Sequence, residues 1–207
     1  MATRLTRSER KEQIRADLIA AAKDVFLRRG YHQASLEEIS AEAGWSKGAI
    51  FSNFAGKDDL FMAVLEAHNQ EQHQEQSAQM RAGGSLAGGL AFAGRMLADV
   101  QVRVPGWTPL LVQFWTHASH SPDLRKRVAA AHEDLLDQYA MIISELAARD
   151  GLEFVVPAKE VARSASSLVR GLALERLLDP ATVSDQRLEE LFSAHVLSFT
   201  RPRVGSE

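Results

Sequence analysis

Residues 35–54 read SLEEISAEAGWSKGAIFSNF, and this stretch decides how the N-terminal part of the chain folds. It opens with Ser35 and, three positions later, Glu38, a pair that is typical of a capping box at a helix start. In such a box the serine hydroxyl caps the amide of Glu38, and the glutamate reaches back to the amide of Ser35. Gly44 lies where this helix should end. The pattern therefore predicts a short helix that begins after Ser35 and ends before a tight turn.

A second helix should follow the turn at once, with Ser46 as its N-cap. Trp45 and Ile50 flank that cap at the spacing of a hydrophobic staple, which fixes the angle at which the chain enters the helix. Residues 36–54 are therefore predicted to form two short helices joined by a glycine turn. A helical hairpin that only completes a core is the alternative interpretation of this pattern.

The start of the second helix has the chemistry of a surface that contacts DNA. Gly48 and Ala49 project nothing bulky, so the free amide groups of the first turn can approach base edges and phosphates closely. Lys47 adds a positive charge that suits a phosphate or a guanine. A helix–turn–helix works in this way, because its second helix lies in the major groove while the first braces it across the backbone.

The distribution of charge favours contact between the first quarter of the chain and a polyanion. The whole chain of 207 residues has a formal net charge of −3, which does not indicate a general nucleic-acid binder. Residues 1–57, however, hold 10 Lys and Arg against 7 Asp and Glu, whereas residues 58–207 hold 14 against 20. A helix over residues 8–29, with Gly30 as its C-terminal stop, belongs to this basic part. The basic first quarter is therefore the part expected to meet DNA.

The segment SLEEISAEAGWSKGAIFSNFAGKDDLF, with the helix before it, resembles the DNA-binding signature of TetR-family (tetracycline-repressor-like) transcriptional regulators over residues 8–65. Phe51 stands where that family usually has a tyrosine whose hydroxyl binds a phosphate, and Asn53 stands where histidine is frequent. Trp45 is bulkier than the small aliphatic residue that is usual there. The resemblance implies DNA contacts from Ser35, Ser46, Lys47, Gly48, Ala49, Phe51, Ser52, Asn53 and Lys57.

The rest of the chain is predicted to be helical, because apolar residues recur at steps of three and four. A helix should begin near Lys57 and continue through the polar stretch NQEQHQEQ at 69–76 as a solvated extension. The nearest approach to a strand is LEFVV at 152–156. We therefore expect an all-α protein of about nine helices. The resemblance implies a three-helix helix–turn–helix DNA-binding domain at 1–57 and an effector-binding and dimerisation domain at 58–207.

Two C-terminal helices carry the residues expected at a dimer interface. The helix over 184–200 has a single apolar stripe, whereas the helix over 157–178 is apolar over so much of its circumference that it should be buried on two sides. The resemblance implies that one side packs against a second copy of the chain, giving a homodimer. A monomer whose terminal helices only complete the core is the alternative. The expected interface residues are Val169, Leu174, Leu177, Leu178, Leu188, Leu191, Phe192, His195 and Phe199.

Aromatic and bulky residues are concentrated in the helices that surround the effector in this family, and they suggest a small, largely apolar ligand. Any one of them is more simply explained as core. His117 and Gln113 are further polar candidates for orienting the ligand. The candidate pocket residues are Phe61, Leu65, His68, Phe92, Met96, Trp107, Leu111, Phe114, Trp115, His132, Tyr139, Leu172 and Glu175.

Composition argues against several other classes of protein. The chain has no cysteine, so neither a disulfide framework nor a thiolate metal site is expected. No apolar run reaches the roughly 18 residues that span a bilayer, and the N-terminus lacks the apolar core of a signal peptide, so we expect a cytoplasmic protein with no membrane partner. His117 and His120 lie three apart without a carboxylate to complete a metal site, and no G-x-S-x-G nucleophile elbow occurs. We therefore expect no metal, no cofactor and no enzymatic activity.

The sequence thus predicts a sequence-specific DNA-binding transcriptional regulator, a repressor that a small-molecule effector releases from its operator. The expected partners are double-stranded operator DNA, the effector and a second copy of the chain. One alternative is an effector-independent DNA-binding regulator with a solid core. Another, in a different class, is a helical enzyme or interaction protein that keeps the hairpin only as scaffold. The residues leave open the operator, the effector and the choice between repressor and activator.

Overall fold

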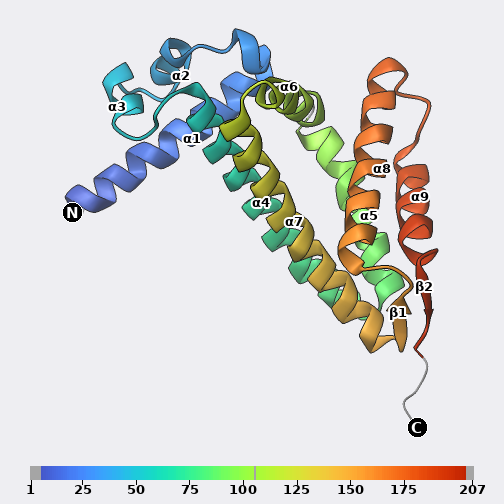
Figure 1. Cartoon of the computed structure of the whole chain (residues 1–207). Coiled ribbons are helices and arrows are strands. Elements are labelled where there is room, and N and C mark those ends of the chain that lie inside the picture. The colour runs from blue at the N-terminus through green and yellow to red at the C-terminus, as the bar shows by residue number, and fades with distance from the viewer. Residues whose placement is uncertain (1–5, 105, 204–207) are drawn as a thin grey trace, which may run out of the picture. The chain divides into compact units, whose positions relative to one another are not determined.

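A computed structural model describes residues 6–104 and 106–203, with all of their side chains except those of residues 75, 76 and 99–103. This described part contains nine α-helices and one two-stranded antiparallel ribbon, which confirms the all-α class (Figure 1). None of its helices combines the length and the apolar character that crossing a bilayer requires. The elements are α1 (Arg7–Gln33), α2 (Leu36–Glu42), α3 (Lys47–Phe51), α4 (Lys57–Ala82), α5 (Leu86–Arg103), α6 (Trp107–Ser119), α7 (Pro122–Arg149), β1 (Leu152–Phe154), α8 (Ala158–Leu178), α9 (Asp185–Leu197) and β2 (Thr200–Pro202).

The chain divides into two compact units, and the division does not follow the order of the sequence. The first unit comprises the chain up to Gln70 together with Leu110–Val128, so it contains α1, α2, α3, the first half of α4 and most of α6. The second unit comprises Glu71–Pro109 and the chain from Ala129 onward. The predicted boundary between residues 57 and 58 was a division by function, and it stays a prediction.

In the first unit, α1 supplies the surface on which the α2–α3 hairpin packs (Figure 1). Its residues Leu18, Ala22 and Val25 recur at steps of three and four and are completely buried. Ile39 of α2 and Ile50 of α3 are also completely buried, so an apolar anchor holds each short helix. These helices are too short to persist by themselves, and tertiary packing therefore stabilises them.

An aromatic cluster joins α6 to the first unit. Phe26 and Tyr31 of α1, Phe61 of α4 and Phe114 of α6 are all almost completely buried. The ring centroids of Phe61 and Phe114 lie 4.0 Å apart, and the Tyr31 ring packs edge-on against Phe114 at 5.1 Å and Phe61 at 5.3 Å. Truncating a buried ring of this kind costs about 3–5 kcal/mol. α6 is therefore part of the core that supports the hairpin, although it is distant in sequence.

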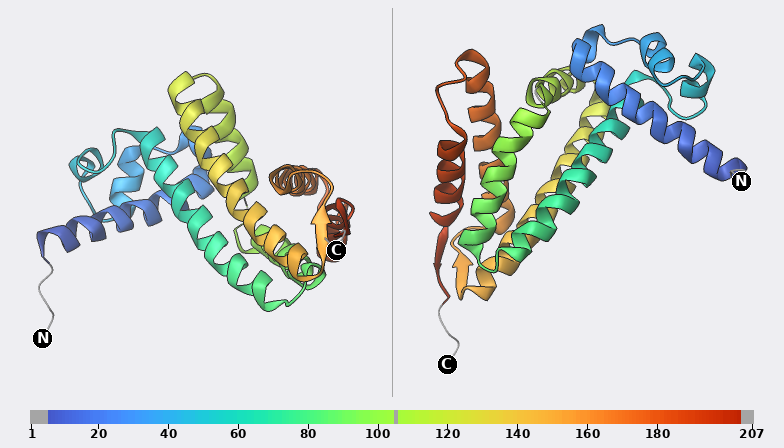
Figure 2. Two further views of the ribbon diagram at one scale, coloured as in Figure 1. Left: turned by 60° about the horizontal axis from the view of Figure 1, so that its bottom comes forward. Right: turned by 180° about the vertical axis from the view of Figure 1, so that it is seen from behind.

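In the second unit, α5 runs alongside α9, as the right panel of Figure 2 shows. The two helices approach closely at Gly94, because a Cβ placed there would lie 2.8 Å from the Cα of Glu189. The neighbouring Arg95 donates from Nη1 to Glu189 Oε1 at 2.9 Å. The core of this unit gathers residues from α4, α5, α7, α8 and α9, namely Met80, Leu86, Leu90, Ala93, Leu136, Ile142, Ile143, Leu146, Ala147, Val161, Ala162, Ala165 and Val196.

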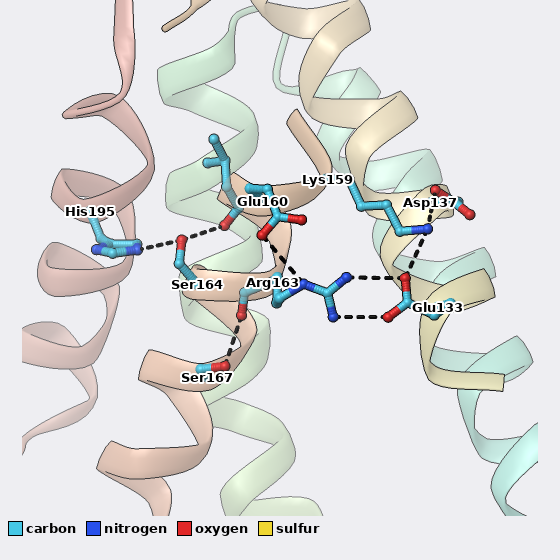
Figure 3. A network of polar contacts seen from close by, with 9 residues as sticks. Glu133, Asp137, Lys159, Glu160, Arg163, Ser164, Ser167 and His195 are labelled. Atoms are coloured by element: carbon cyan, nitrogen blue, oxygen red, sulfur yellow. Dashed lines mark hydrogen bonds and ion pairs between the residues drawn. The ribbon is translucent and has the colours of Figure 1, made fainter. Parts of the chain in front are cut away.

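Four charged residues bind α7 to α8, and we refer to them as the α7–α8 clamp (Figure 3). Arg163 of α8 makes two hydrogen bonds to the Glu133 carboxylate of α7, at 2.9 and 3.0 Å. Lys159, one turn earlier on α8, contacts Glu133 at 3.0 Å and Asp137 at 2.8 Å. The hydrogen bonds from Arg163 and then from Lys159 lower the pKa of the Glu133 carboxyl to about 2. The clamp is therefore fully charged at neutral pH.

The two-stranded ribbon lies beside the core of the second unit. β1 consists of the first three residues of the LEFVV segment, and it pairs antiparallel with β2. α9, which was predicted to reach residue 200, ends at Leu197 because Thr200 pairs with Phe154. Leu152, Phe154 and Phe199 pack against the core of the unit, and this packing explains why the chain turns away from the helix.

Candidate nucleic-acid interface

The two caps predicted for the α2–α3 hairpin are present. Ser35 Oγ accepts a hydrogen bond from the Glu38 amide at 3.0 Å, and Ser46 Oγ accepts one from the Ala49 amide at 3.3 Å. The Glu38 carboxylate accepts from Arg29 Nε at 3.0 Å in place of the predicted return bond to Ser35, because a charged donor is the stronger partner. The predicted capping box is therefore half formed. A complete capping box occurs instead at the start of α1, where the sequence analysis did not assign one.

One face of α3 is open to solvent, and several of the residues predicted to contact DNA lie on it. Lys47, Gly48 and Ser52 are exposed and Phe51 is 55% exposed, whereas Ile50 is completely buried. A Cβ placed at Gly48 would come no closer than 3.6 Å to its nearest neighbour, Ser46 Oγ. The fold itself therefore does not require glycine at this position.

The only charged side chain of α3, Lys47, is held by a carboxylate of α2. Its ammonium group pairs with the Glu37 carboxylate and lies 6.0 Å from the centre of the Phe51 ring. The hydrogen bond from Lys47 is the main cause that lowers the pKa of Glu37. Both side chains are more than half exposed, so a phosphate can compete with Glu37 for the ammonium group.

Two of the neutral residues predicted to contact DNA bond to their own helix. Ser52 Oγ donates to the Ala49 carbonyl at 2.9 Å, and Asn53 Nδ2 donates to the same carbonyl at 2.8 Å. These bonds satisfy a backbone oxygen at the C-terminal end of α3. Asn53 Oδ1 is buried and accepts no hydrogen bond from the described residues. Asn53 therefore supports the end of α3, and contact with DNA would require a different rotamer.

Lys57 makes internal contacts that its predicted role did not include. Its ammonium group donates to the carbonyls of His32 at 3.2 Å and Ala34 at 3.1 Å, and lies 4.7 Å from the centre of the Tyr31 ring. Burial lowers the pKa of Lys57, and the nearby Asp58 carboxylate partly offsets that effect. Lys57 therefore joins the start of α4 to the end of α1. This contact helps to fix these two helices relative to each other.

Two further residues hold α3 against α1, and the sequence analysis missed both. The Arg15 guanidinium lies 4.4 Å from the centre of the Phe54 ring and donates to the Asn53 carbonyl at 3.3 Å. Asp17 Oδ2 accepts a hydrogen bond from Trp45 Nε1 at 3.1 Å. The sequence carries no signal for such contacts, because the partners of Arg15 and Asp17 lie 38 and 28 residues away in the chain.

The end of α1 is tied to α6 at a glycine. The backbone leaves helical geometry at Gly30, where φ is 75° and ψ is 165°, at the position where the sequence predicted a stop. The Tyr31 amide that follows donates to Gln113 Oε1 at 3.1 Å. A Cβ at Gly30 would lie 2.8 Å from the same Gln113 oxygen. The backbone angles therefore require glycine here, and a larger residue would also displace the end of the Gln113 side chain.

The start of α4 gathers polar contacts from α1, α6 and α7. Asp58 accepts a hydrogen bond from the Tyr31 hydroxyl and lies 3.2 Å from His117 Nε2. Burial and the Asp58 carboxylate raise the pKa of Tyr31, so the hydroxyl stays a donor. Arg127 of α7 donates to Asp59 at 2.6 Å. The first unit is therefore held together by polar contacts around the α4 start as well as by the aromatic cluster.

The predicted pocket residues fall in both units, and their burial differs. Phe61, Leu65, His68, Leu111, Phe114 and Trp115 belong to the first unit, and Phe92, Met96, Trp107, His132, Tyr139, Leu172 and Glu175 belong to the second. Glu175 is exposed, and Phe92, Leu111, Trp115, His132, Tyr139 and Leu172 are half-buried, whereas the remaining six are buried. No group of three His, Asp or Glu side chains that would suit a metal ion occurs in the described residues.

The polar stretch at 69–76 is not solvated on every side, so that prediction was wrong in part. The ring of His73 packs against Tyr139 of α7, with 6.2 Å between the ring centroids. Burial, followed by the charge of Arg81, lowers the pKa of His73, and burial raises the pKa of Tyr139 to about 12. Both rings are therefore uncharged at neutral pH. The prediction failed at this position because composition does not show that an uncharged imidazole can pack against an aromatic ring of another helix.

The residues predicted for the dimer interface differ in their exposure to solvent. Leu178 is 90% exposed and Leu177 is 56% exposed, at the end of α8. Val169 and Leu188 are buried within the chain itself, and His195 Nε2 lies 3.0 Å from Ser164 Oγ. Leu174, Leu191, Phe192 and Phe199 are half-buried. Among the predicted interface residues, the exposed apolar surface is therefore concentrated at the C-terminal end of α8.

An exposed helix–turn–helix joined to a helical C-terminal part defines a class of bacterial regulators, and comparisons with known proteins agree. The family model of tetR-family bacterial regulatory proteins matches residues 18–64, and that of the C-terminal domain of BetI-type transcriptional repressors matches residues 89–201. The chain belongs to the TetR family of bacterial regulatory proteins, a family of DNA-binding transcriptional regulators.

Individual relatives align with different lengths of this chain. The transcriptional activator FasR of Mycolicibacterium smegmatis is 45% identical over 65 residues, which are 31% of this chain and 28% of FasR. The transcriptional repressor Rv3405c of Mycobacterium tuberculosis is 31% identical over 132 residues, which are 59% of this chain and 69% of Rv3405c. A crystal structure of a TetR-family regulator from Mesorhizobium loti superimposes with a TM-score of 0.73 at 24% identity, over 94% of this chain and 97% of that chain. The alignment with FasR thus covers less than a third of either chain, whereas the fold is shared over most of this chain.

Proposed function

We propose that this protein is a sequence-specific DNA-binding repressor that acts in the cytoplasm as a homodimer and leaves its operator when a small, largely apolar effector binds. The exposed face of α3 carries the DNA-binding part of this proposal. That face presents Lys47, a glycine that the fold does not need, and the ring of Phe51. A major groove accounts for all three, because it requires close approach, contains phosphates on both sides and exposes thymine methyl groups to apolar side chains.

A homodimer suits this role because two copies of α3 can engage two half-sites one helical turn apart, about 34–36 Å. The exposure of Leu177 and Leu178 supports it, since neighbouring large apolar side chains in water mark a surface that meets a partner. A second copy that packs on the end of α8 would remove both side chains from water.

Repression, rather than activation, is favoured by the extent of the alignments. Rv3405c is a repressor and is similar to this chain over 132 residues, well beyond the helix–turn–helix. FasR is an activator, but its similarity covers only 65 residues. The longer of these two alignments, which extends into the C-terminal part, is therefore with a repressor.

Release by an effector requires that the ligand bind better to the arrangement that does not fit DNA, since otherwise no population shifts. The half-buried Phe92, Tyr139 and Leu172 are the predicted pocket residues of the second unit that remain partly open, and they favour a largely apolar ligand. Such a ligand would change the spacing of the two recognition helices, so that both half-sites could no longer be engaged together.

DNA binding is tested with the full-length protein and the DNA upstream of its own gene, by fluorescence anisotropy. Wild type should bind this duplex more tightly than a scrambled duplex of the same composition. Lys47→Ala should weaken both and flatten the slope of log K against log salt by roughly 0.9 for each phosphate that the variant no longer binds. Gly48→Ala should weaken operator binding while stability is unchanged or raised, because alanine is favoured in a helix by about 0.5–1 kcal/mol. Equal binding of wild type to both duplexes would contradict sequence-specific recognition.

Effector release is tested separately with a panel of small apolar compounds. Compounds that raise the Tm of the protein are ligands by mass action. At saturating concentration such a ligand should lower the affinity for the operator found above. The release mechanism fails if every ligand that raises Tm leaves operator affinity unchanged.

A further inference from the structure

The basic residues of the helix–turn–helix fall into two groups according to their partners. Those beyond the first two turns of α1 have internal contacts. Arg28 and Arg29 pair with Glu42 and Glu38, Lys47 pairs with Glu37, Lys57 binds two carbonyls and Arg15 stacks on Phe54. Arg7, Arg10 and Lys11, in contrast, are exposed and form no ion pair with any described residue. The start of α1 is therefore where this domain carries cations without internal partners.

These three cations lie on one side of α1. At 3.6 residues per turn, Arg7, Arg10 and Lys11 fall within an arc of about 100°, and the buried Leu18 lies inside the same arc. Glu9 lies on the opposite side of the helix. The cationic stripe therefore continues the side of α1 that faces the α2–α3 hairpin, while the carboxylate points away from it.

The start of α1 also continues past the hairpin. Arg15 contacts Phe54 and the Asn53 carbonyl, which fixes where α1 passes the end of α3. Eight residues of helix separate Arg15 from Arg7, which is about 12 Å. Figure 1 and the right panel of Figure 2 both show this helical segment extending beyond α2 and α3. Its cations can therefore reach phosphates outside the stretch of groove that α3 occupies.

The exposed segment is held in helical form by a cap rather than by packing. Thr6 Oγ1 accepts from the Glu9 amide at 3.2 Å, and the Thr6 amide donates to Glu9 Oε2 at 2.7 Å. Residues 6–13 are all exposed, so no apolar burial contributes to their order. Capping a solvated segment keeps the three cations at fixed spacing, which lowers the entropy lost when they bind.

We propose that the first two turns of α1 form a second DNA contact, in which Arg7, Arg10 and Lys11 bind backbone phosphates that flank the half-site read by α3. This proposal rests on the proposed DNA-binding function. The contact is independent of sequence, so it adds affinity and register to the recognition made by α3.

The test is the salt dependence of operator binding for the full-length Arg7→Gln/Arg10→Gln/Lys11→Gln variant. In each protomer the slope of log K against log salt should fall by roughly 0.9 for every phosphate that the variant no longer binds, with equal weakening on operator and scrambled duplexes. Phosphate-ethylation interference should lose the outermost positions of each half-site and keep those near α3. The control is Arg125→Gln/Lys126→Gln, which removes exposed cations of α7, outside the helix–turn–helix, and should leave the slope unchanged.

The outcomes separate this second DNA contact from the function on which it rests. If the triple variant keeps the wild-type slope while Lys47→Ala reduces it, the second contact is wrong and DNA binding by α3 stands. If the α7 control reduces the slope as much as the triple variant, the effect is one of net charge and the second contact is again wrong. If wild type binds no DNA at all, both proposals fail. Far-ultraviolet circular dichroism should show wild-type helicity for each variant, since all five positions are exposed.

Discussion

At the scale of single residues, the proposed DNA-binding face is partly neutralised by the protein itself. Lys47 is the charged group of α3, and in the free protein it is paired with Glu37 of α2. DNA binding would exchange this carboxylate for a phosphate, so part of the attraction is offset by the loss of the internal pair. We therefore expect the pair to weaken the attraction of α3 to DNA of any sequence.

We expect Glu37→Gln to strengthen binding to operator and scrambled DNA alike, because Lys47 would be released from its internal pair and one repulsive charge would be removed. Affinity should rise several-fold, with a steeper dependence on salt, in anisotropy titrations between low and physiological ionic strength. Glu42→Gln is the matched control, since it removes a carboxylate of α2 that pairs with Arg28 rather than with α3. Equal gains in the two variants would show that net charge, and not release of Lys47, is responsible.

Residue types and spacing predicted part of the candidate site. Ser35 and Ser46 were predicted as caps and both are caps, because a cap depends on residues three positions away. The internal contacts of Lys57 were not predictable, since its carbonyl partners His32 and Ala34 become neighbours only after α1 and α4 pack together. Which of the predicted residues contact DNA stays a prediction.

At the scale of elements, the junction between α1 and α6 depends on the conformation of one glycine. The φ and ψ angles of Gly30 lie in a region that is accessible essentially to glycine alone. The kink turns the Tyr31 amide toward Gln113, so the same backbone geometry both ends the regular helix and makes the contact with α6.

Gly30→Ala should lower the free energy of unfolding by about 1–3 kcal/mol, because alanine is strained at this φ and its Cβ would meet Gln113. Urea unfolding followed by circular dichroism measures the change. Gly48→Ala is the control, because that position is open and helical and should tolerate the same substitution. Similar stability of the two variants would mean that the kink relaxes without cost.

The α7–α8 clamp predicts a pH dependence of stability. The pKa of Glu133 is about 2 in the folded protein against an ordinary value of 4.5, so the unfolded state binds more protons between these values. The stabilisation from this carboxylate is therefore fully present above pH 4.5 and is lost as the pH falls through about 2. Glu133→Gln should be less stable than wild type in urea at pH 7, and the difference should shrink steadily below about pH 4.5.

Glu160→Gln is a suitable control for this experiment. Glu160 also faces Arg163, at 3.5 Å, but both residues belong to α8, so their contact does not join two helices. Its substitution should change stability little at either pH. A Glu133→Gln variant whose stability difference is the same at about pH 7 and about pH 2.5 would contradict the role assigned to the clamp.

Secondary structure was largely predictable because most elements are long amphipathic helices. The helix predicted over 157–178 agrees closely with α8, and its period comes from burial of one face from Val161 to Ala173. β2 was not predicted. Its three residues, which include Pro202, are too few to show the alternation of apolar and polar residues that indicates a strand. Their strand conformation comes from pairing with β1, about 50 residues earlier. Similarly, the contribution of α6 to the first unit depends on tertiary packing that periodicity does not encode.

At the scale of the whole molecule, the proposed function depends on a second copy of the chain. The end of α8 exposes Leu177 and Leu178, whereas most other predicted interface residues are at least half-buried within the chain. A dimer centred on this end of α8 would explain why these side chains are not replaced by polar ones.

Leu178→Glu should therefore dissociate the homodimer, since a charge would be buried without a partner at the interface. We expect the dimer dissociation constant to rise by roughly a hundredfold, equivalent to about 2.8 kcal/mol, in sedimentation-velocity experiments. Operator affinity should fall with it, because a monomer engages only one half-site. Met141→Glu changes another exposed apolar residue, 67% exposed on α7, and should leave the dimer intact. A variant at Leu178 that sediments as wild type would rule out this surface.

The burial of Phe114 against Tyr31 and Phe61 has a consequence for recombination between related regulators. A crossover near residue 57 would combine α1 from one parent with α6 from another. The aromatic rings and hydrogen-bonding groups of these two helices would then come from different proteins and would not be matched to each other. A hybrid that takes the chain up to Gln70 together with the segment 110–128 would inherit partners that already match. When biosensors are built from this protein, the DNA-binding part that is exchanged between regulators should therefore consist of two segments that are separate in sequence.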